Sequence, residues 1–274
     1  MSVEIIAHLG NVDPVMRRLI AAAGPFAIER REEHSPFEAL ARAIAHQQLN
    51  GKAAQSILNR FVSTCGRGSF PGPAALLELE AAALRASGFS FAKIAALRDL
   101  AAKTLSGIVP ARDALHTLGD LEIIERLTAV RGIGRWTVEM LLIFQLRRPD
   151  VLPVDDFGVR GGFRAAYGLA RMPKPKALAA WGERWKPFRT TAAWYLWRAV
   201  ELKRAGTLPA PAERIRLPRV KKLRRAARRG AAGPKRGKPR ARKRVRARRA
   251  PPAGARAPRS APRGQRARKA RNTG

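Results

Sequence analysis

Two stretches of the chain carry residue types that could do chemistry. Asp155 and Asp156 stand side by side just before an apolar helical pattern, and further upstream Gly132 and Gly134 flank a single isoleucine. A carboxylate can stabilise developing positive charge or orient a water molecule. A glycine turn followed by a helix brings backbone N–H groups close to an anion. The sequence therefore offers a candidate acid and a candidate phosphate site.

Each stretch also has a plainer interpretation. For an Asp pair considered alone, two N-cap acids for the following helix are the simpler interpretation. The two glycines could form a helix–helix connector that binds nothing, and spacing alone does not decide. A dinucleotide loop is not expected because the third glycine and a preceding strand are missing, and the Lys-Ser/Thr pair of a Walker loop is absent.

The elements that must position these residues are expected to be helices. Capping residues and apolar stripes at helical spacing recur along the chain, whereas no run of alternating β-branched residues argues for a sheet. We therefore predict an all-α domain without internal repeats. The expected helices begin at the caps Asp13, Ser35, Asn50, Ser90 and Asp120, follow Gly134 and the Asp pair, and cover 74–86, 176–181 and 187–202.

Positive charge is concentrated at the end of the chain. The formal net charge is +35, and 26 of the 55 Lys and Arg but only one of the 20 Asp and Glu lie from Gly206 onward. No aromatic residue follows Trp197. Such a segment cannot bury enough apolar surface to order itself. We predict a folded domain over 1–207, a disordered basic tail over 208–274, and a polyanionic partner, most simply nucleic acid.

Other classes of protein are excluded or disfavoured by composition. The single cysteine, Cys65, excludes a disulfide framework, a Cys-ligated zinc site and a four-Cys iron–sulfur cluster. No uncharged run reaches the length of a membrane span, and the first residues lack a signal-peptide pattern. The four histidines have no metal-binding spacing and are expected at the surface or at helix caps. We expect a cytoplasmic, nucleoid-associated protein, most simply a monomer, without a membrane partner.

Four motifs together resemble a known family, the helix–hairpin–helix DNA glycosylases named for their hairpin and Gly-Pro…Asp motif. The match is closest to the 3-methyladenine DNA glycosylase II branch, in its compact form without an extra N-terminal domain. The motifs span roughly 35–205 and are AIAHQQLN from Ala43, LTAVRGIGRWT from Leu127, LPVDDFGVR from Leu152 and ERWKPFR from Glu183. The resemblance implies a two-lobed helical glycosylase fold that contains the hairpin.

The resemblance assigns catalysis to the second acid. It makes Asp156 the residue that stabilises the oxocarbenium-like sugar as the N-glycosidic bond breaks, and it leaves Asp155 as the expected cap. Relatives with lyase activity carry a lysine at the hairpin position occupied here by Trp136. The resemblance therefore implies a monofunctional hydrolase that needs no cofactor for catalysis and has no iron–sulfur cluster.

The resemblance also assigns the groups that hold the substrate. Trp136, Met140 and Trp197 are expected around the base, where aromatic rings would stack on an alkylated, cationic purine. The turn Gln47-Gln48-Leu49-Asn50 is expected to enter the DNA as the target nucleotide is extruded, with Gln48 the first choice of wedge and Leu49 the second. Arg131, Gly132, Ile133 and Gly134 are expected on the DNA backbone. The backbone carbonyls of Thr128, Val130 and Ile133 are expected to hold a structural monovalent cation.

The sequence thus predicts a DNA-3-methyladenine glycosylase II that excises alkylated purines from duplex DNA and initiates base excision repair. Two alternatives stay open: a glycosylase for another damaged base, and a non-catalytic architectural DNA-binding protein whose basic tail is its main functional part.

Overall fold

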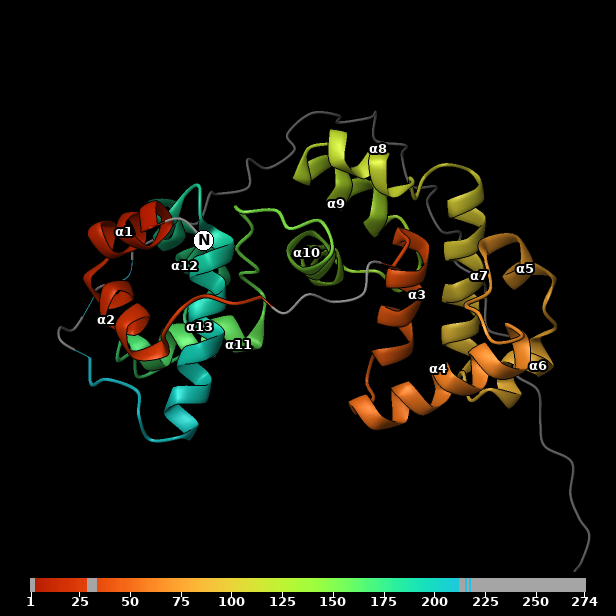
Figure 1. Cartoon of the computed structure of the whole chain (residues 1–274), viewed down its shortest axis with the longest axis horizontal. Helices are drawn as coiled ribbons and strands as arrows, with labels where there is room; N and C mark the ends of the chain where they lie inside the picture. Colours follow the sequence, from red (N-terminus) through yellow and green to blue (C-terminus); the bar gives the residue numbers. More distant parts are fainter. Residues whose placement is uncertain (1–2, 29–33, 212–214, 216, 218–274) are drawn as a thin grey trace, which may run out of the picture. The chain divides into compact units, whose positions relative to one another are not determined.

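The computed structural model describes residues 3–28, 34–211, 215 and 217, and in these ranges every regular element is a helix (Figure 1). The all-α prediction is confirmed. The elements are α1 (Val3–Val12), α2 (Pro14–Ala23), α3 (Pro36–His46), α4 (Gly51–Cys65), α5 (Pro73–Glu78), α6 (Ala81–Ala86), α7 (Phe91–Leu105), α8 (Arg112–Thr117), α9 (Asp120–Thr128), α10 (Arg135–Phe144), α11 (Phe157–Ala166), α12 (Pro175–Gly182), the 3-10 helix η1 (Glu183–Trp185) and α13 (Arg189–Arg204).

Side-chain caps begin several helices as the sequence predicts. The side chains of Asp13, Ser35, Asn50 and Ser90 each accept a hydrogen bond from a backbone N–H two or three residues later. These bonds satisfy amides that have no partner within the helix. None of the helices in the described ranges is long and apolar enough to cross a bilayer.

Two expectations about helices are corrected, and helices α1 and α8 lie where none was predicted. The single helix expected over 74–86 is split into α5 and α6 by extended backbone at Leu79 and Glu80. Asp120 is not a cap; Gly119 takes that position, and the Asp120 carboxylate instead pairs with Nε of Arg148 at 3.3 Å. Each difference reflects a tertiary contact or a loop that local propensity does not report.

The helices build two hydrophobic cores. The first core is formed by residues from α3 to α10 and includes Leu40, Phe61, Leu97 and Leu142. The second core is formed by α1, α2, α11, α12, η1 and α13, so both ends of the described chain meet in it (Figure 1). Trp197 on α13 packs against both cores. The segment between α10 and α11, along which the chain passes from the first core to the second, carries the Asp pair.

A buried carboxylate organises the second core. Asp13, which is 1% exposed, accepts hydrogen bonds at Oδ2 from the hydroxyl of Tyr167 at 2.7 Å and from Nε1 of Trp181 and Trp185 at 3.1 Å each. Burial and the neighbouring Asp13 charge raise the pKa of Tyr167 well above its ordinary value. A buried charge is tolerated when it is fully hydrogen-bonded. Asp13 therefore ties the start of α2 to α11, α12 and η1.

Packing against the second core continues beyond the predicted domain boundary at 207. Leu208, Ile215 and Leu217 are partly buried against it. Residues 218–274, which make up most of the predicted basic tail, lie outside the described residues. The boundary and the disorder of the tail stay predictions.

Candidate functional site

The carboxylate of Asp156 is held by three hydrogen-bond donors. Its Oδ1 accepts from the backbone N–H of Val159 at 2.7 Å and from Nε1 of Trp197 at 2.8 Å. Its Oδ2 accepts from Nε1 of Trp136 at 2.7 Å. The two indoles come from α13 and α10, so elements of both cores fix the direction of this one side chain.

The expectation that Asp155 caps α11 is wrong. Asp156 is the N-cap, because α11 begins at Phe157 and the cap oxygen reaches the amide of Val159. Asp155 is exposed. The capping interpretation and the catalytic assignment therefore fall on the same residue, and the cap bond occupies only one of its two oxygens.

Gly158 allows α11 to start directly beneath Trp197. A Cβ at this position would lie 2.8 Å from Cδ1 of Trp197 and 3.1 Å from Oδ1 of Asp156. Both distances are shorter than ordinary van der Waals contact. Glycine is thus required by the close approach of the helix backbone to the indole that holds the carboxylate.

The loop that delivers Asp156 is clamped to the start of α13. Arg189 binds both carboxylate oxygens of Asp150, at 2.7 and 2.9 Å. The Thr190 hydroxyl donates to the carbonyl of Arg148 at 2.6 Å and accepts from the N–H of Val151 at 3.0 Å. A bidentate pair and a bridging hydroxyl restrict a loop more than isolated contacts do. These bonds set the spacing between α10 and α11.

A cavity of about 870 Å³ opens beside Trp136, which is itself 48% exposed. Met140, which the resemblance places around the base, also lines it. The cavity is large enough for a purine. Its lining from α3 and the turn after it is Ala39, Leu40, Arg42, Ala43, His46, Gln47 and Gln48, with His34, Gly132, Thr137, Leu141, Phe144 and Gln145 completing it.

Trp197, which the resemblance places around the base, is not among the residues that line this cavity. Its ring instead stacks on Phe144, with centroids 5.8 Å apart and planes at 23°, while its N–H binds Asp156. Phe144 lines the cavity, although it was not among the residues expected around the base. His34 and His46, expected at the surface or at caps, line the cavity as well.

The hairpin between α9 and α10 is a tight turn. The N–H of Ile133 donates to the carbonyl of Val130 at 3.1 Å, and Gly132 has φ +78°. A positive φ at the third residue is the mark of a type II turn and favours glycine. Arg131 occupies the second position, where proline is common, and its N–H donates to Oδ2 of Asp99 on α7 at 2.6 Å.

Two charged residues of helix α7, Asp99 and Lys103, bind the backbone at the hairpin. Lys103 donates to Asp99 at 2.7 Å and to the carbonyl of Ala129 at 2.6 Å. Burial alone would raise the pKa of Asp99, but the hydrogen bonds from Arg131 and Lys103 outweigh it and lower the pKa below its usual value. This contact could not be predicted from the sequence, because no residue near Asp99 in the chain indicates that it meets the hairpin.

The turn after α3 reaches the hairpin and also presents side chains to solvent. Nε2 of Gln47 donates to the carbonyl of Gly132 at 2.7 Å. Gln48 has φ +57° and is exposed, Leu49 is 40% exposed, and Asn50 caps α4. The structure therefore brings the two predicted DNA-contacting segments together.

The carbonyls expected to hold a cation lie at the end of α9 (Thr128) and in the hairpin turn that follows it (Val130 and Ile133). The Val130 carbonyl accepts the N–H of Ile133 and keeps a second lone pair. In the described residues no group of His, Cys, Asp and Glu side chains forms a metal site. Main-chain oxygens are the donor type that suits a hard cation.

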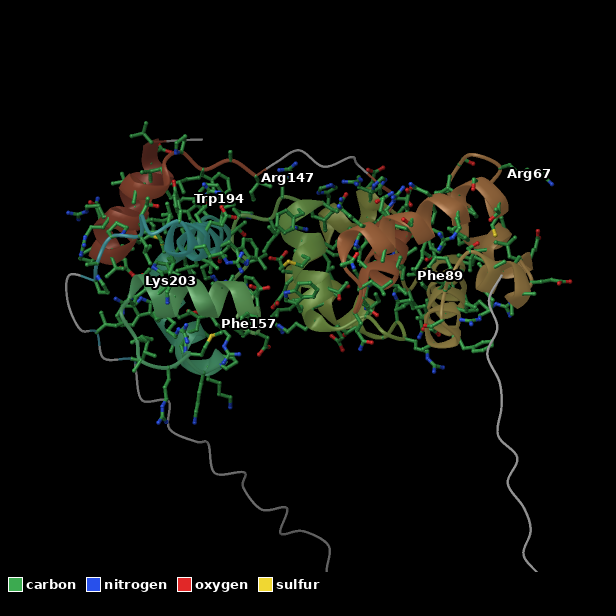
Figure 2. All side chains as sticks on the ribbon, turned by 90° about the horizontal axis from the view of Figure 1, so that it is seen from below. Arg67, Phe89, Arg147, Phe157, Trp194 and Lys203 are labelled. Carbon is green, nitrogen blue, oxygen red and sulfur yellow. The ribbon has the colours of Figure 1, made fainter. Side chains whose placement is uncertain are left out.

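Two further features near Asp156 had no sequence assignment. Phe157, the first residue of α11 and the next residue after Asp156 in the chain, is 77% exposed (Figure 2). Glu139 on α10 is 2% exposed and accepts from Nε of Arg135 at 2.8 Å. Burial raises the pKa of Glu139, Arg135 opposes the shift, and Asp155 and Asp156 add to it.

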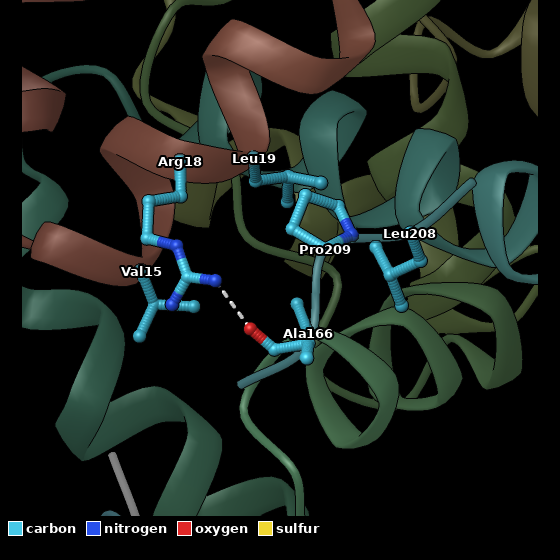
Figure 3. Close-up of a pocket in the computed structure, with 7 residues that line it drawn as sticks. Val15, Arg18, Leu19, Ala166, Leu208 and Pro209 are labelled. Atoms are coloured by element: carbon cyan, nitrogen blue, oxygen red, sulfur yellow. Dashed lines mark hydrogen bonds between the residues drawn. The ribbon is translucent and has the colours of Figure 1, made fainter. Parts of the chain in front are cut away.

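A second crevice lies where the chain after α13 crosses α2 and α11. Leu208 and Pro209 meet Val15 and Leu19 there, and Arg18 donates to the Ala210 carbonyl (Figure 3). Its volume is about 10 Å³, which is too small for an organic ligand. The crevice is a small gap where the chain after α13 packs against the second core.

Comparison with known proteins identifies the superfamily. The model of the HhH-GPD superfamily of base excision DNA repair proteins matches residues 41–187. The chain is 44% identical over 196 residues to DNA-3-methyladenine glycosylase 1 of Schizosaccharomyces pombe, covering 71% of this chain and 86% of that protein.

Solved structures agree in fold. The S. pombe 3-methyladenine DNA glycosylase Mag1 in complex with abasic DNA has a TM-score of 0.66 at 43% identity and covers 73% of this chain and 98% of its own. The DNA-3-methyladenine glycosidase of Bacillus halodurans has a TM-score of 0.67 at 33% identity, covering 73% and 91%. The residues matched by the family model contain the hairpin and Asp156, and the chain belongs to the HhH-GPD superfamily of base excision DNA repair proteins.

Proposed function

We propose that the protein is a monofunctional DNA glycosylase that hydrolyses the N-glycosidic bond of alkylated purines in duplex DNA and thereby initiates base excision repair. One observation carries the proposal. Trp136 lines a purine-sized cavity and at the same time holds Oδ2 of Asp156, so a base-stacking wall and a carboxylate meet at one place. Support for the substrate class comes from relatives that are named as 3-methyladenine glycosylases.

Asp156 supplies the charge that the reaction needs. As the bond between C1′ and the base nitrogen breaks, its electron pair leaves with the base and positive charge develops on the sugar. A carboxylate against that sugar stabilises the charge, and water then adds to C1′ with loss of a proton. The indole N–H groups of Trp136 and Trp197 keep the carboxylate aimed, which limits reorganisation during the step.

The cavity selects the base by its chemistry. An alkylated purine such as 3-methyladenine is cationic or electron-poor, and the faces of Trp136 and Phe144 attract such a ring by stacking and cation–π interaction. Met140 adds a polarisable, adaptable wall. A cationic base is also a good leaving group, so the reaction needs no strong general acid.

The hairpin and the turn after α3 hold the DNA around the extruded nucleotide. The amides at the start of α10 face a phosphate, and Gln48, which is exposed in the turn after α3, fills the gap in the stack. When bound, a monovalent cation on the carbonyls of Thr128, Val130 and Ile133 would offset phosphate charge. The residue at position 136 is tryptophan, which cannot form a Schiff base, so hydrolysis leaves an intact abasic strand.

The test is release of free base from methylated duplex DNA. The protein is incubated with N-methylated duplex, the free bases are identified, and the strand is examined for breaks. The proposal expects 3-methyladenine-type bases and unbroken abasic strands. Release from deaminated or oxidised DNA alone would favour a glycosylase for another lesion, and release from no substrate would favour a DNA-binding protein without catalysis.

A further inference from the structure

Glu139 is a buried carboxylate for which the proposed reaction has no use. It lies on α10 with a side chain that is 3% exposed, and its hydrogen-bonded partner is Nε of Arg135 at 2.8 Å. Burying a carboxylate is costly unless a partner compensates, and burial raises the pKa of Glu139. The contribution of this pair to helix stability does not by itself explain why the Glu139 carboxylate is buried.

Arg135 stands at a position where a cation is unfavourable. It is the first residue of α10, whose N-cap Gly134 makes no side-chain cap bond. The positive end of the helix dipole repels a guanidinium there. The Arg135 side chain is nevertheless 54% exposed, and in the described ranges neither Nη atom donates to another residue. Glu139 thus fixes one edge of the guanidinium and leaves the others directed to solvent.

The contrast with a second Arg–Glu pair in the same hairpin motif shows what is unusual. Arg126 and Glu122 on α9 have the same four-residue spacing, but both side chains are exposed, at 43% and 47%. Arg126 also uses both Nε and Nη2 on its partner. That pair has the form of an ordinary surface ion pair, which contributes little. The Arg135–Glu139 pair has one buried and one outward-facing member.

We propose that Arg135 is a DNA phosphate ligand and that the buried Glu139 is the positioning residue that holds its guanidinium toward the phosphodiester backbone. Arg offers several donors in a rigid fork, and a phosphate oxygen is the acceptor that this fork fits beside the hairpin amides. The inference rests on the proposed placement of the hairpin on DNA and adds a side chain to it.

The experiment measures the affinity of the full chain for a duplex with a non-cleavable abasic analogue, as a function of salt. Arg135→Ala is expected to weaken binding roughly tenfold and to lower the slope of log affinity against log salt by about one. Arg135→Lys keeps the slope, since the charge remains, but binds less tightly than wild type. Arg126→Ala is the matched control and should leave the slope unchanged.

Glu139→Gln separates positioning from simple charge. If Glu139 positions Arg135, the substitution weakens binding in the wild-type background but strengthens it in the Arg135→Ala background, where only the removal of negative charge remains. Stronger binding in both backgrounds would overturn the positioning role, and an unchanged slope in Arg135→Ala would overturn the phosphate contact. Urea unfolding confirms that each variant is folded.

Gly134→Ala distinguishes failure of the inference from failure of the proposed function. An added Cβ at Gly134 meets nothing within 4 Å, so it obstructs only an approaching ligand. If Gly134→Ala weakens binding and Arg135→Ala does not, the hairpin holds DNA without Arg135. If neither substitution weakens binding, the proposed placement of the hairpin is wrong as well.

Discussion

The hairpin turn allows a test in which one substitution is expected to destabilise the wild-type protein but to stabilise a variant that lacks Asp99. Arg131 occupies the second position of a type II turn, where the turn itself does not use its N–H. That N–H donates to Asp99 at 2.6 Å. Proline would suit the turn but would remove this donor and place its ring carbon against the carboxylate. The perturbation is Arg131→Pro, made in the wild type and in Asp99→Ala.

The expected magnitudes follow from these contacts. In the wild-type background, loss of a hydrogen bond to a charged group costs about 1.5–3 kcal/mol, while the stiffer unfolded chain returns about 0.4–1 kcal/mol. The net effect is a destabilisation of about 1–2 kcal/mol. In Asp99→Ala the N–H has already lost this partner, so only the proline gain of about 0.4–1 kcal/mol remains.

The assay is urea unfolding of the four proteins, with the free energy of unfolding in water taken from each curve. Arg131→Pro should destabilise the wild type and stabilise Asp99→Ala. The lowered pKa of Asp99 adds a pH signature, because its contribution is present above the unfolded-state pKa and is lost as pH falls through the folded-state value. If Arg131→Pro changed the free energy of unfolding equally in both backgrounds, the hydrogen bond from the Arg131 N–H to Asp99 would not be the cause of the destabilisation.

Three further predictions concern the site. Gly134→Ala should weaken binding to abasic-analogue DNA at least threefold, because the added methyl group obstructs the approach of a phosphate. Gly119→Ala is the control, since Gly119 is also an N-cap glycine with open space around it, and it should leave the affinity unchanged. Equal affinities of the two variants in fluorescence anisotropy would contradict the prediction. Trp197→Phe removes the donor to Oδ1 of Asp156 and should slow single-turnover base release about ten- to a hundredfold at unchanged DNA affinity; an unchanged rate would show that the indole does not aim the carboxylate. Because burial raises the pKa of Glu139, its ionisation costs more in the folded state. The stability of wild type relative to Glu139→Gln should therefore fall as pH rises from the unfolded-state pKa of Glu139 through its higher folded-state pKa. A pH-independent difference in the free energy of unfolding would contradict the raised pKa.

The parts of the fold that local sequence encodes could be predicted. Caps such as Asp13 and Asn50 satisfy amides within one turn of their own helix, so their roles are visible in the neighbouring residues. The glycine turn and the Asp pair are equally local patterns. Their order along the chain, together with the resemblance, was enough to predict a helical glycosylase fold.

The parts that depend on contacts between distant residues could not be predicted. Asp99 lies 32 residues before the amide that it accepts, and Asp13 lies 154 residues before the Tyr167 hydroxyl. Phe144 has the pattern of a core residue, although it faces both the cavity and Trp197. Whether Asp155 or Asp156 caps α11 depends on a difference of one residue in where the helix begins. Helix boundaries are the feature that a sequence pattern predicts least well.

Catalysis by Asp156 is tested most directly by measuring single-turnover release of methylated purine by the Asp156→Asn variant. Asparagine keeps an oxygen for Val159 and Trp197 but presents an amide N–H₂ to Trp136, so folding is checked by urea unfolding and DNA binding by affinity for the abasic analogue. We expect a folded variant that binds DNA and releases base at least about a hundredfold more slowly than wild type. Release within a few-fold of the wild-type rate would contradict the assignment of catalysis to Asp156.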